Sequence, residues 1–207
     1  MKKIIKNKNI TLFFCLILSL FMLTGCSVVS SALSEEDTEN TWDTSDYVKI
    51  GGVLTVQKSD SRLALLDNKN ALSSDGLFYC AWTIGNSEPY ENSEGDTVDL
   101  YDAQLYLLLV EFVNSQKAQE NMDDWLSSAK FNYELVKEEE ITCNGQTYTL
   151  ITYSYKNKSN PYARGASAFG IYENNAVCVE LACRDNFADD PESILIDFLD
   201  NCTYNSN

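Results

Sequence analysis

The sequence predicts an α+β domain over residues 47–207, with helices packed on a mostly antiparallel sheet. Apolar residues at alternate positions recur in several segments between Tyr47 and Cys183, which is the pattern of half-buried strands. Asn144-Gly145 and Asn174-Asn175 each separate two such segments, which predicts two tight antiparallel hairpins. Two other segments repeat their apolar residues every three or four positions, as amphipathic helices do. Strands, a helix, two hairpins and a closing helix together indicate an α+β sandwich.

The first part of this domain contains four predicted strands. Residues 48–56 alternate in polarity and predict one strand, with a bend or bulge at Gly51-Gly52. Residues 63–66 predict a short second strand. In the third, one face should carry Phe78, Cys80, Trp82 and Ile84. The fourth, residues 105–112, is apolar at both parities, so we expect it to lie centrally with both faces covered.

Loops should separate these strands. Asn68-Lys69-Asn70 and Ser73-Ser74-Asp75-Gly76 are rich in turn-forming residues. The acidic stretch from Gly85 to Asp99 also contains glycine, proline and asparagine, and is predicted to be a loop.

Helical spacing begins after the central strand. Ala118, Met122, Trp125, Leu126 and Ala129 form one apolar stripe, which should face the sheet, with Asn114 or Ser115 as the N-cap. Whether Trp125 also lines a ligand groove stays open, although core packing is favoured. The last helix should begin after Asp190, with Pro191 in its first position. Its predicted buried stripe consists of Ile194, Leu195, Phe198, Leu199 and Cys202.

The two hairpins should have defined registers. Residues 138–143 and 146–155 flank the first turn, and residues 166–173 and 176–183 flank the second. A turn at Asn174-Asn175 would place Tyr172 opposite Val177, Gly170 opposite Val179 and Ala168 opposite Leu181. One face of this second hairpin would then be consistently apolar.

The N-terminus has the features of an export signal. Four lysines precede an apolar run from Ile10 to Leu23, which is too short for a comfortable membrane span. An ordinary secretory signal or an uncleaved anchor would also show these features. Leu23-Thr24-Gly25-Cys26, however, resembles a bacterial lipobox. The resemblance implies cleavage between Gly25 and Cys26 and lipid attachment to the Cys26 thiol.

The predicted organisation is therefore a signal peptide (1–25), a disordered tether rich in serine and acidic residues (26–46), and one folded domain (47–207). The domain would be lipid-anchored on the extracytoplasmic face of the cell membrane. Cleavage removes four of the 15 basic residues and none of the 31 acidic ones, so the formal net charge changes from −16 to −20. Such a charge keeps a domain soluble and excludes nucleic acid as a partner.

The two hairpins and the ending ENNAVCVELACRDNFADDPESILIDFL resemble the PsbP-like fold. This fold is named for an extrinsic photosystem subunit and is found in bacterial envelope lipoproteins of the DcrB type. In element order the resemblance covers residues 47–207 and implies a PsbP-like sandwich. It implies no shared catalytic residues, so it assigns no active site, metal or cofactor.

Catalytic patterns are weak in this chain. There is no histidine, which excludes Ser-His and Cys-His catalysis and histidine metal ligands. Ser127-Ser128-Ala129-Lys130 matches S-x-x-K without the accompanying motifs, and Tyr133 and Lys137 match Y-x-x-x-K without a dinucleotide-binding unit. We reject both.

Acidic and aromatic residues offer two further candidates. Acids before the last helix could form a calcium loop, although helix capping and a solvated loop explain them better. Tyrosines of the first hairpin and its exit could bind sugar or peptide, although cross-strand packing is favoured. The acids of the calcium-loop candidate are Asp185, Asp189, Asp190 and Glu192. The tyrosines of the binding-surface candidate are Tyr148, Tyr153, Tyr155 and Tyr162.

Five cysteines follow Cys26, and their odd number leaves at least one unpaired. A disulfide between Cys183 and Cys202 is one candidate, because both lie on predicted core faces within one strand–loop–helix unit. Free buried thiols are the alternative. The spacings do not resemble a metal site. Besides Cys183 and Cys202, the cysteines after Cys26 are Cys80, Cys143 and Cys178.

These observations favour a non-catalytic, membrane-tethered module that binds an unknown protein or small ligand, or assists envelope assembly. The alternative is an extracytoplasmic hydrolase that uses an Asp/Glu pair as acid and base, since carboxylates are the abundant titratable groups.

Overall fold

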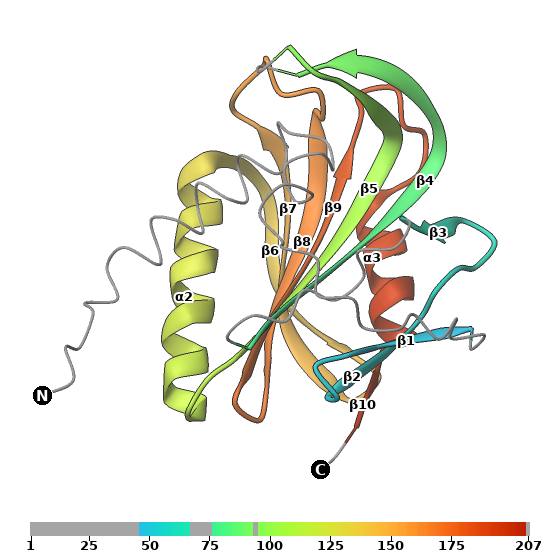
Figure 1. Cartoon of the computed structure of the whole chain (residues 1–207). Helices are drawn as coiled ribbons and strands as arrows, with labels where there is room; N and C mark the ends of the chain where they lie inside the picture. Colours follow the sequence, from blue (N-terminus) through green and yellow to red (C-terminus); the bar gives the residue numbers. More distant parts are fainter. Residues whose placement is uncertain (1–45, 67–75, 93–94, 206–207) are drawn as a thin grey trace, which may run out of the picture. The chain divides into compact units, whose positions relative to one another are not determined.

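The computed structural model describes residues 46–66, 76–92 and 95–205 (Figure 1). The predicted signal peptide, the lipobox-like stretch, most of the predicted tether, and the predicted loops Asn68–Asn70 and Ser73–Asp75 lie outside the described residues. The described part belongs to two compact units. One contains residues 88–92 and 95–100, and the larger one contains residues 46–66, 76–87 and 101–205.

The described strands form two sheets, and every pair of them with a defined register is antiparallel. The small sheet has the order β1 (Tyr47–Ile50), β2 (Leu54–Gln57) and β10 (Thr203–Tyr204). The large sheet has seven strands in the order β3 (Leu63–Leu65), β4 (Leu77–Glu91), β5 (Thr97–Glu111), β9 (Asn175–Cys183), β8 (Arg164–Tyr172), β7 (Gln146–Tyr155) and β6 (Tyr133–Cys143). The predicted α+β class is confirmed, and the strand predicted to be central, now β5, lies inside the large sheet.

The first predicted strand is wrong in its topology. Gly51-Gly52 does not bulge a single strand; it reverses the chain, so that β1 and β2 form a hairpin. Gly51 and Gly52 have φ values of 59° and 70°, and Val53 N donates to Ile50 O at 3.1 Å. Positive φ at both central positions is what a tight type I′ turn requires, and glycine adopts it without steric cost.

The acidic stretch from Gly85 to Asp99 is also not a loop along its whole length. β4 continues to Glu91 and β5 begins at Thr97. In the smaller unit, Asn92 N donates to Asp96 O and Asp96 N donates to Asn92 Oδ1, both at 2.9 Å, which closes the turn. Most side chains of β4 beyond Ile84 are exposed, so the apolar alternation that would identify a strand is missing there.

Both helices begin where the sequence predicts. Asn114 caps α2 (Ser115–Asn132), its side chain accepting from Lys117 N at 2.9 Å. Asp190 caps α3 (Pro191–Asp200), its side chain accepting from Ser193 N at 3.2 Å. Side-chain oxygens at the N-cap satisfy backbone donors that have no partner inside the helix. The predicted stripe of the last helix is buried, and Trp125 of α2 is buried as core packing requires.

The two long hairpins differ in how well their turns were predicted. Cys143 pairs with Gln146 around Asn144-Gly145, as expected. The second turn consists of Glu173-Asn174 instead of Asn174-Asn175, with Glu173 at a φ of 52°, so Tyr172 pairs with Asn175. The register therefore differs by two residues from the prediction. A shift of two keeps every side chain on its predicted face.

α2 and α3 cover opposite faces of the large sheet, and both contact β8 and β9 (Figure 1). All nine residues of β9 are buried, because this strand lies mid-sheet under both helices. We call the two sides the α3 face and the α2 face. The α3 face, together with β1 and β2, forms the main apolar core, which includes Ile50, Leu54, Trp82, Leu105, Leu107, Val179, Leu195 and Phe198.

Candidate functional site

The α2 face contains a buried carboxyl group at the middle of the sheet. Glu180 lies in β9 and is 2% exposed. It is the only buried acidic residue among those that the structure describes. Its direct neighbours are Ser167 of β8 and Tyr106 of β5, which pair with it across the two flanking strands. A charge-bearing group in this position needs hydrogen-bonding partners to offset its loss of water.

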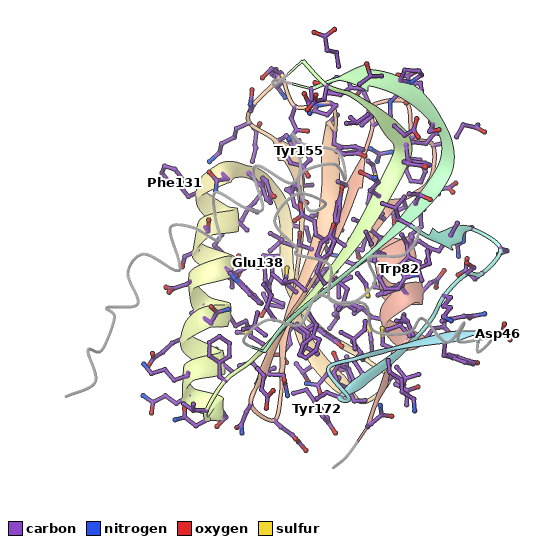
Figure 2. The ribbon with its side chains drawn as sticks, viewed as in Figure 1. Asp46, Trp82, Phe131, Glu138, Tyr155 and Tyr172 are labelled. Carbon is purple, nitrogen blue, oxygen red and sulfur yellow. The ribbon has the colours of Figure 1, made fainter. Side chains whose placement is uncertain are left out.

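Three tyrosines supply these partners. Tyr133 OH donates to Glu180 Oε1 at 2.9 Å and Tyr155 OH donates at 3.2 Å, while Tyr153 OH makes a shorter bond to the same oxygen. Ser167 Oγ lies 3.4 Å from Tyr153 OH. We call Glu180, Tyr133, Tyr153, Tyr155 and Ser167 the Glu180 cluster. In Figure 2, Tyr155 is labelled beside the sheet.

The end of α2 places the first of these hydroxyls. Tyr133 is the C-cap of the helix, with extended backbone angles, and its N–H donates to Ala129 O. It is also the first residue of β6 and pairs with Tyr155 of β7. The Tyr133 and Tyr153 rings stack with their centroids 3.9 Å apart. Because the strand begins directly at the cap, the helix end fixes where this hydroxyl points.

A glycine makes room for the second hydroxyl. Gly165 of β8 pairs with Tyr153 of β7. A Cβ at Gly165 would lie 2.8 Å from Tyr153 OH and 2.4 Å from Leu181 O, so no larger residue fits without displacing backbone. Gly165 therefore allows the Tyr153 ring to lie across β8 and reach β9.

A second polar group lies next to the Glu180 cluster. Gln104 of β5 pairs with Ala182, two positions from Glu180, and its Oε1 accepts from Tyr106 OH at 2.6 Å and from Tyr162 OH at 2.5 Å. Tyr106 in turn stacks on Tyr79 of β4. The α2 face thus has two neighbouring oxygen acceptors, each satisfied by tyrosine hydroxyls.

Burial dominates the electrostatics of the cluster. Burial raises the pKa of the Glu180 carboxyl, and the hydrogen bonds from Tyr153, Tyr133 and Tyr155 act in the opposite direction. Burial, followed by the Glu180 charge, raises the pKa values of all three tyrosines well above their ordinary value. The same two causes raise the pKa of the Cys178 thiol, two residues away. The tyrosines therefore act here as hydrogen-bond donors and not as phenolate bases.

The geometry differs from that of an acid–base pair. Among the residues that the structure describes, every hydrogen bond to Glu180 comes from a tyrosine hydroxyl, and no second carboxyl joins the cluster. An acid and a base in a hydrolase must both reach the substrate. Glu180 is instead enclosed by its own partners. Chemically, the arrangement supports a rigid polar cluster that fixes the positions of α2, β6 and β7 on β9.

The sequence-predicted candidates are mostly placed elsewhere. Asp190 caps α3, and Glu192 accepts from Lys137 Nζ at 2.7 Å. Lys130 of the S-x-x-K match forms a salt bridge with Glu138 at 2.6 Å. Across the described ranges, no three His, Cys, Asp or Glu side chains gather as a metal site would need.

The predicted tyrosine surface divides between the two faces. Tyr153 and Tyr155 enter the Glu180 cluster and Tyr162 binds Gln104, whereas the hydroxyls of Tyr148 and Tyr204 lie 2.6 Å apart on the α3 face. All four predicted tyrosines are buried, which favours packing over sugar or peptide binding. The sequence prediction missed Glu180. Its signal was a lone carboxyl within the apolar run Val177–Cys183.

All five cysteines that the structure describes are buried free thiols. No two of these five thiols are bonded in the structure, so the candidate pair Cys183 and Cys202 stays a prediction. Cys183 pairs with Arg164, and the charges of Arg164, Asp190 and Asp189 act on its thiol, so it lies near the start of α3. Cys202 follows the end of α3. A helix of ten residues is about 15 Å long, whereas a disulfide needs Cα atoms within about 7 Å.

One small pocket lies on the α3 side, away from the Glu180 cluster. Residues of β2, the β2–β3 connection and α3 line it, and its total empty volume is about 250 Å³ with open solvent included. Sites that enclose a small ligand are usually larger than this. The lining residues are Val56, Gln57, Ser59, Asp60, Leu63, Phe198 and Asn201.

No protein-family model and no curated protein matches the chain. Among solved structures, it is similar to cyanobacterial PsbP (CyanoP) from Synechocystis sp. PCC 6803, with 11% identity over 71% of this chain and 95% of that one, and a TM-score of 0.38. A Pseudomonas aeruginosa protein of unknown function, titled a putative regulator, has 11% identity over 56% of this chain and 95% of its own, with a TM-score of 0.35.

The extracellular domain of PknH from Mycobacterium tuberculosis is also similar, with 14% identity over 60% of this chain and 62% of that one, and a TM-score of 0.33. At such scores, the likenesses assign neither a ligand nor an activity to this chain. Within the described ranges, neither α2 nor α3 has the length and apolar character to cross a membrane.

Proposed function

We propose that this chain is an extracytoplasmic lipoprotein whose folded domain is anchored through Cys26 and binds an envelope protein without catalysing a reaction. The lipobox at Leu23–Cys26 supports the anchor. The binding surface that we propose surrounds the end of α2. It consists of Phe131, Val136 and Lys156, and we call it the Phe131 surface.

We place the binding surface on the outside of the domain because the polar groups at the centre of the α2 face already bond to one another. Glu180 already accepts hydrogen bonds from three tyrosines, and Gln104 accepts from two. A ligand would have to break several buried hydrogen bonds to enter, each with the cost of an unsatisfied polar group. A partner that binds the outer surface meets no such cost.

The observation that carries the proposal is a pair of exposed apolar side chains beside one junction. Phe131 is 81% exposed at the end of α2, and Val136 is 77% exposed five residues later in β6. Figure 2 shows Phe131 at the outer end of the helix, directed away from the sheet. A register shift between Leu135 and Lys137 turns Val136 outward. Aromatic side chains in such positions are frequent anchors of protein interfaces.

Local contacts hold this junction in one conformation. Lys130 of α2 and Glu138 of β6 form a salt bridge at 2.6 Å. Lys156 Nζ donates to Phe131 O at 2.5 Å and lies 5.9 Å from the centroid of the Phe131 ring. A surface that is already ordered loses less entropy when it binds. Lys156 adds a positive charge beside the ring, so the partner should present an apolar pocket with an acidic rim.

The proposed lipid anchor would increase the strength of a weak interaction. A tether of about 20 residues has a root-mean-square reach of roughly 25 Å. Confining the domain to that distance from the membrane raises its effective concentration toward partners in the same membrane. For the alternative of an Asp/Glu hydrolase, the described residues provide no specific supporting observation.

Site-specific photo-cross-linking in cells would test the proposal. A photoreactive phenylalanine analogue is placed at Phe131 of the full-length chain, and the same analogue is placed at Val113 as a matched control. Val113 is 88% exposed and precedes the other end of the 18-residue α2, roughly 27 Å away along the helix axis. We expect a discrete cross-linked protein from position 131 and none from position 113.

A second arm tests the anchor separately. Cys26→Ser should abolish incorporation of labelled fatty acid, release the domain from the membrane fraction, and weaken the cross-link at position 131. Fatty-acid labelling of Cys26→Ser would contradict the lipobox. Equal cross-linking from positions 131 and 113, or none from position 131, would contradict the binding surface.

A further inference from the structure

Two cysteines far apart in the sequence lie beside each other in the fold. Cys143 is the last residue of β6, directly before the Asn144-Gly145 turn, and Cys202 follows the end of α3. Asn144 N donates to Asp200 Oδ1 at 3.0 Å, and Asn144 Nδ2 donates to Cys202 O at 2.7 Å, across 58 positions of sequence. These two bonds fix the hairpin turn against the segment that connects α3 to β10.

Both cysteines belong to the same apolar core, where the Cys202 thiol lies 3.4 Å from Phe198 O. Cys143 is 2% exposed and Cys202 is 1% exposed, and both belong to the apolar core of the α3 face. Burial raises the pKa of the Cys202 thiol to about 12, and the nearby Cys143 thiol acts in the same direction. Burial and the adjacent Asp200 raise the pKa of Cys143 to about 11.

The Tyr148 hydroxyl provides a second marker of this proximity. Burial raises its pKa, Tyr204 contributes next, and the Cys202 and Cys143 thiols both add to the shift. Tyr148 belongs to the same apolar core as both cysteines. The candidate pair Cys183 and Cys202 instead stands on either side of α3 in the sequence, Cys183 before the helix and Cys202 after it.

We propose that Cys143 and Cys202 form a disulfide that joins the β6–β7 turn to the end of α3 in an oxidising compartment. Thiols are retained in the cytoplasm and become oxidised outside it. The proposal therefore rests on the extracytoplasmic location proposed above. It accounts for two of the five cysteines after Cys26 and leaves Cys80, Cys178 and Cys183 as buried thiols.

The oxidant is a second disulfide, either a small-molecule disulfide or that of a thiol oxidoreductase. One cysteine thiolate attacks the oxidant, forms a mixed disulfide and releases one oxidant thiol. The second cysteine then displaces the other oxidant sulfur. In total, two protein thiols lose two protons and two electrons, and the oxidant disulfide becomes two thiols. Since both cysteines are buried in the folded protein, this exchange takes place during folding or when the C-terminal segment opens.

The experiment counts the alkylatable thiols of full-length protein isolated from membranes. The protein is denatured and alkylated with iodoacetamide, with and without prior reduction, and its intact mass is measured. The thiol of Cys26 is blocked by lipid, so five cysteines remain. We expect three alkylated thiols without reductant and five after reduction. Proteolysis without reductant should give a peptide that contains Cys143 linked to one that contains Cys202.

Matched variants identify the pair. Cys143→Ser and Cys202→Ser should each show four alkylated thiols with or without reductant. Cys183→Ser should still show two fewer alkylated thiols without reductant than with it. Because alkylation is performed on denatured protein, the count stays interpretable if a variant is less stable. Five alkylated thiols without reductant, or a different linked pair, would overturn the proposal.

A refolding experiment tests the disulfide separately from the proposed extracytoplasmic location. Reduced full-length protein is refolded with oxidised glutathione, and the linked peptides are mapped again. If the Cys143–Cys202 link forms on refolding but protein from cells has five free thiols, the proposal of a disulfide in the cell is overturned. The anchor is then judged separately, by the fatty-acid labelling result. The oxidised protein should melt about 10 °C above its reduced form, and Cys143→Ser should show no such difference.

Discussion

The two faces of the large sheet are filled by different means. On the α3 face, leucines, valines and Trp82 interlock with the helix, and the rings of Trp82 and Phe198 meet edge to face at 5.0 Å. On the α2 face, hydroxyls from two strands converge on Glu180. An apolar face depends mainly on filled volume and tolerates rearrangement. A buried polar cluster depends on the direction of each bond and therefore admits fewer arrangements.

Truncation of Phe198 on the α3 face should give the largest effect. Phe198→Ala removes a buried ring that packs on Trp82 and leaves a cavity, so we expect a loss of about 3–5 kcal/mol in the free energy of unfolding. Phe131→Ser is the matched control, because this phenylalanine is exposed; it should change stability by less than about 0.5 kcal/mol. Urea unfolding measures both. Similar losses for the two variants would break the distinction between core and surface phenylalanines.

Removal of a single hydroxyl from the α2 face should have the next largest effect. Tyr153→Phe keeps the buried ring but deletes the hydroxyl that bonds both Glu180 and Ser167, and we expect a loss of about 1.5–3 kcal/mol. Tyr155→Phe deletes a bond of 3.2 Å from the same oxygen and should lose only about 1 kcal/mol. Thermal and urea unfolding compare the two. If Tyr153→Phe is as stable as the parent chain, the cluster does not hold the α2 face together.

The same difference explains what the sequence could predict. On the α3 face, the alternation of Phe78, Cys80, Trp82 and Ile84 and the helical stripe of α3 each follow from one local period, and the structure has both. Caps at Asn114 and Asp190 were likewise visible, because a cap depends on neighbouring residues only. Features with a local cause were therefore predicted.

The Glu180 cluster has no such local cause. Its hydroxyls come from the end of α2 and from β7, and they reach Glu180 only after β7, β8 and β9 have paired and Gly165 has made room for Tyr153. The reversal at Gly51-Gly52 was missed although its cause is local. Two short strands and one bent strand have the same alternation, but glycine at both central positions, each with positive φ, favours the hairpin.

The smallest predicted effect concerns the charge of Glu180 and depends on pH. Burial raises the folded-state pKa of this carboxyl above its ordinary value of 4.5. The stability that results is fully present below about pH 4.5 and is lost as the pH rises through the folded-state pKa, because the unfolded chain releases its proton first. Glu180→Gln keeps an oxygen acceptor for the tyrosines and cannot ionise.

We therefore expect Glu180→Gln and the parent chain to differ little in stability at acid pH. Above about pH 4.5 the free energy of unfolding of the variant should increase relative to that of the parent chain, by at most about 1.4 kcal/mol per pH unit for one proton. Burial moves the pKa values of Tyr133, Tyr153, Tyr155 and Cys178 upward, so these neighbours remain protonated in that range. Urea unfolding of both chains across the acid-to-neutral range gives the difference. If the parent chain instead gains stability with rising pH relative to the variant, the hydrogen bonds from the three tyrosines outweigh burial, and the cluster is built to hold a carboxylate.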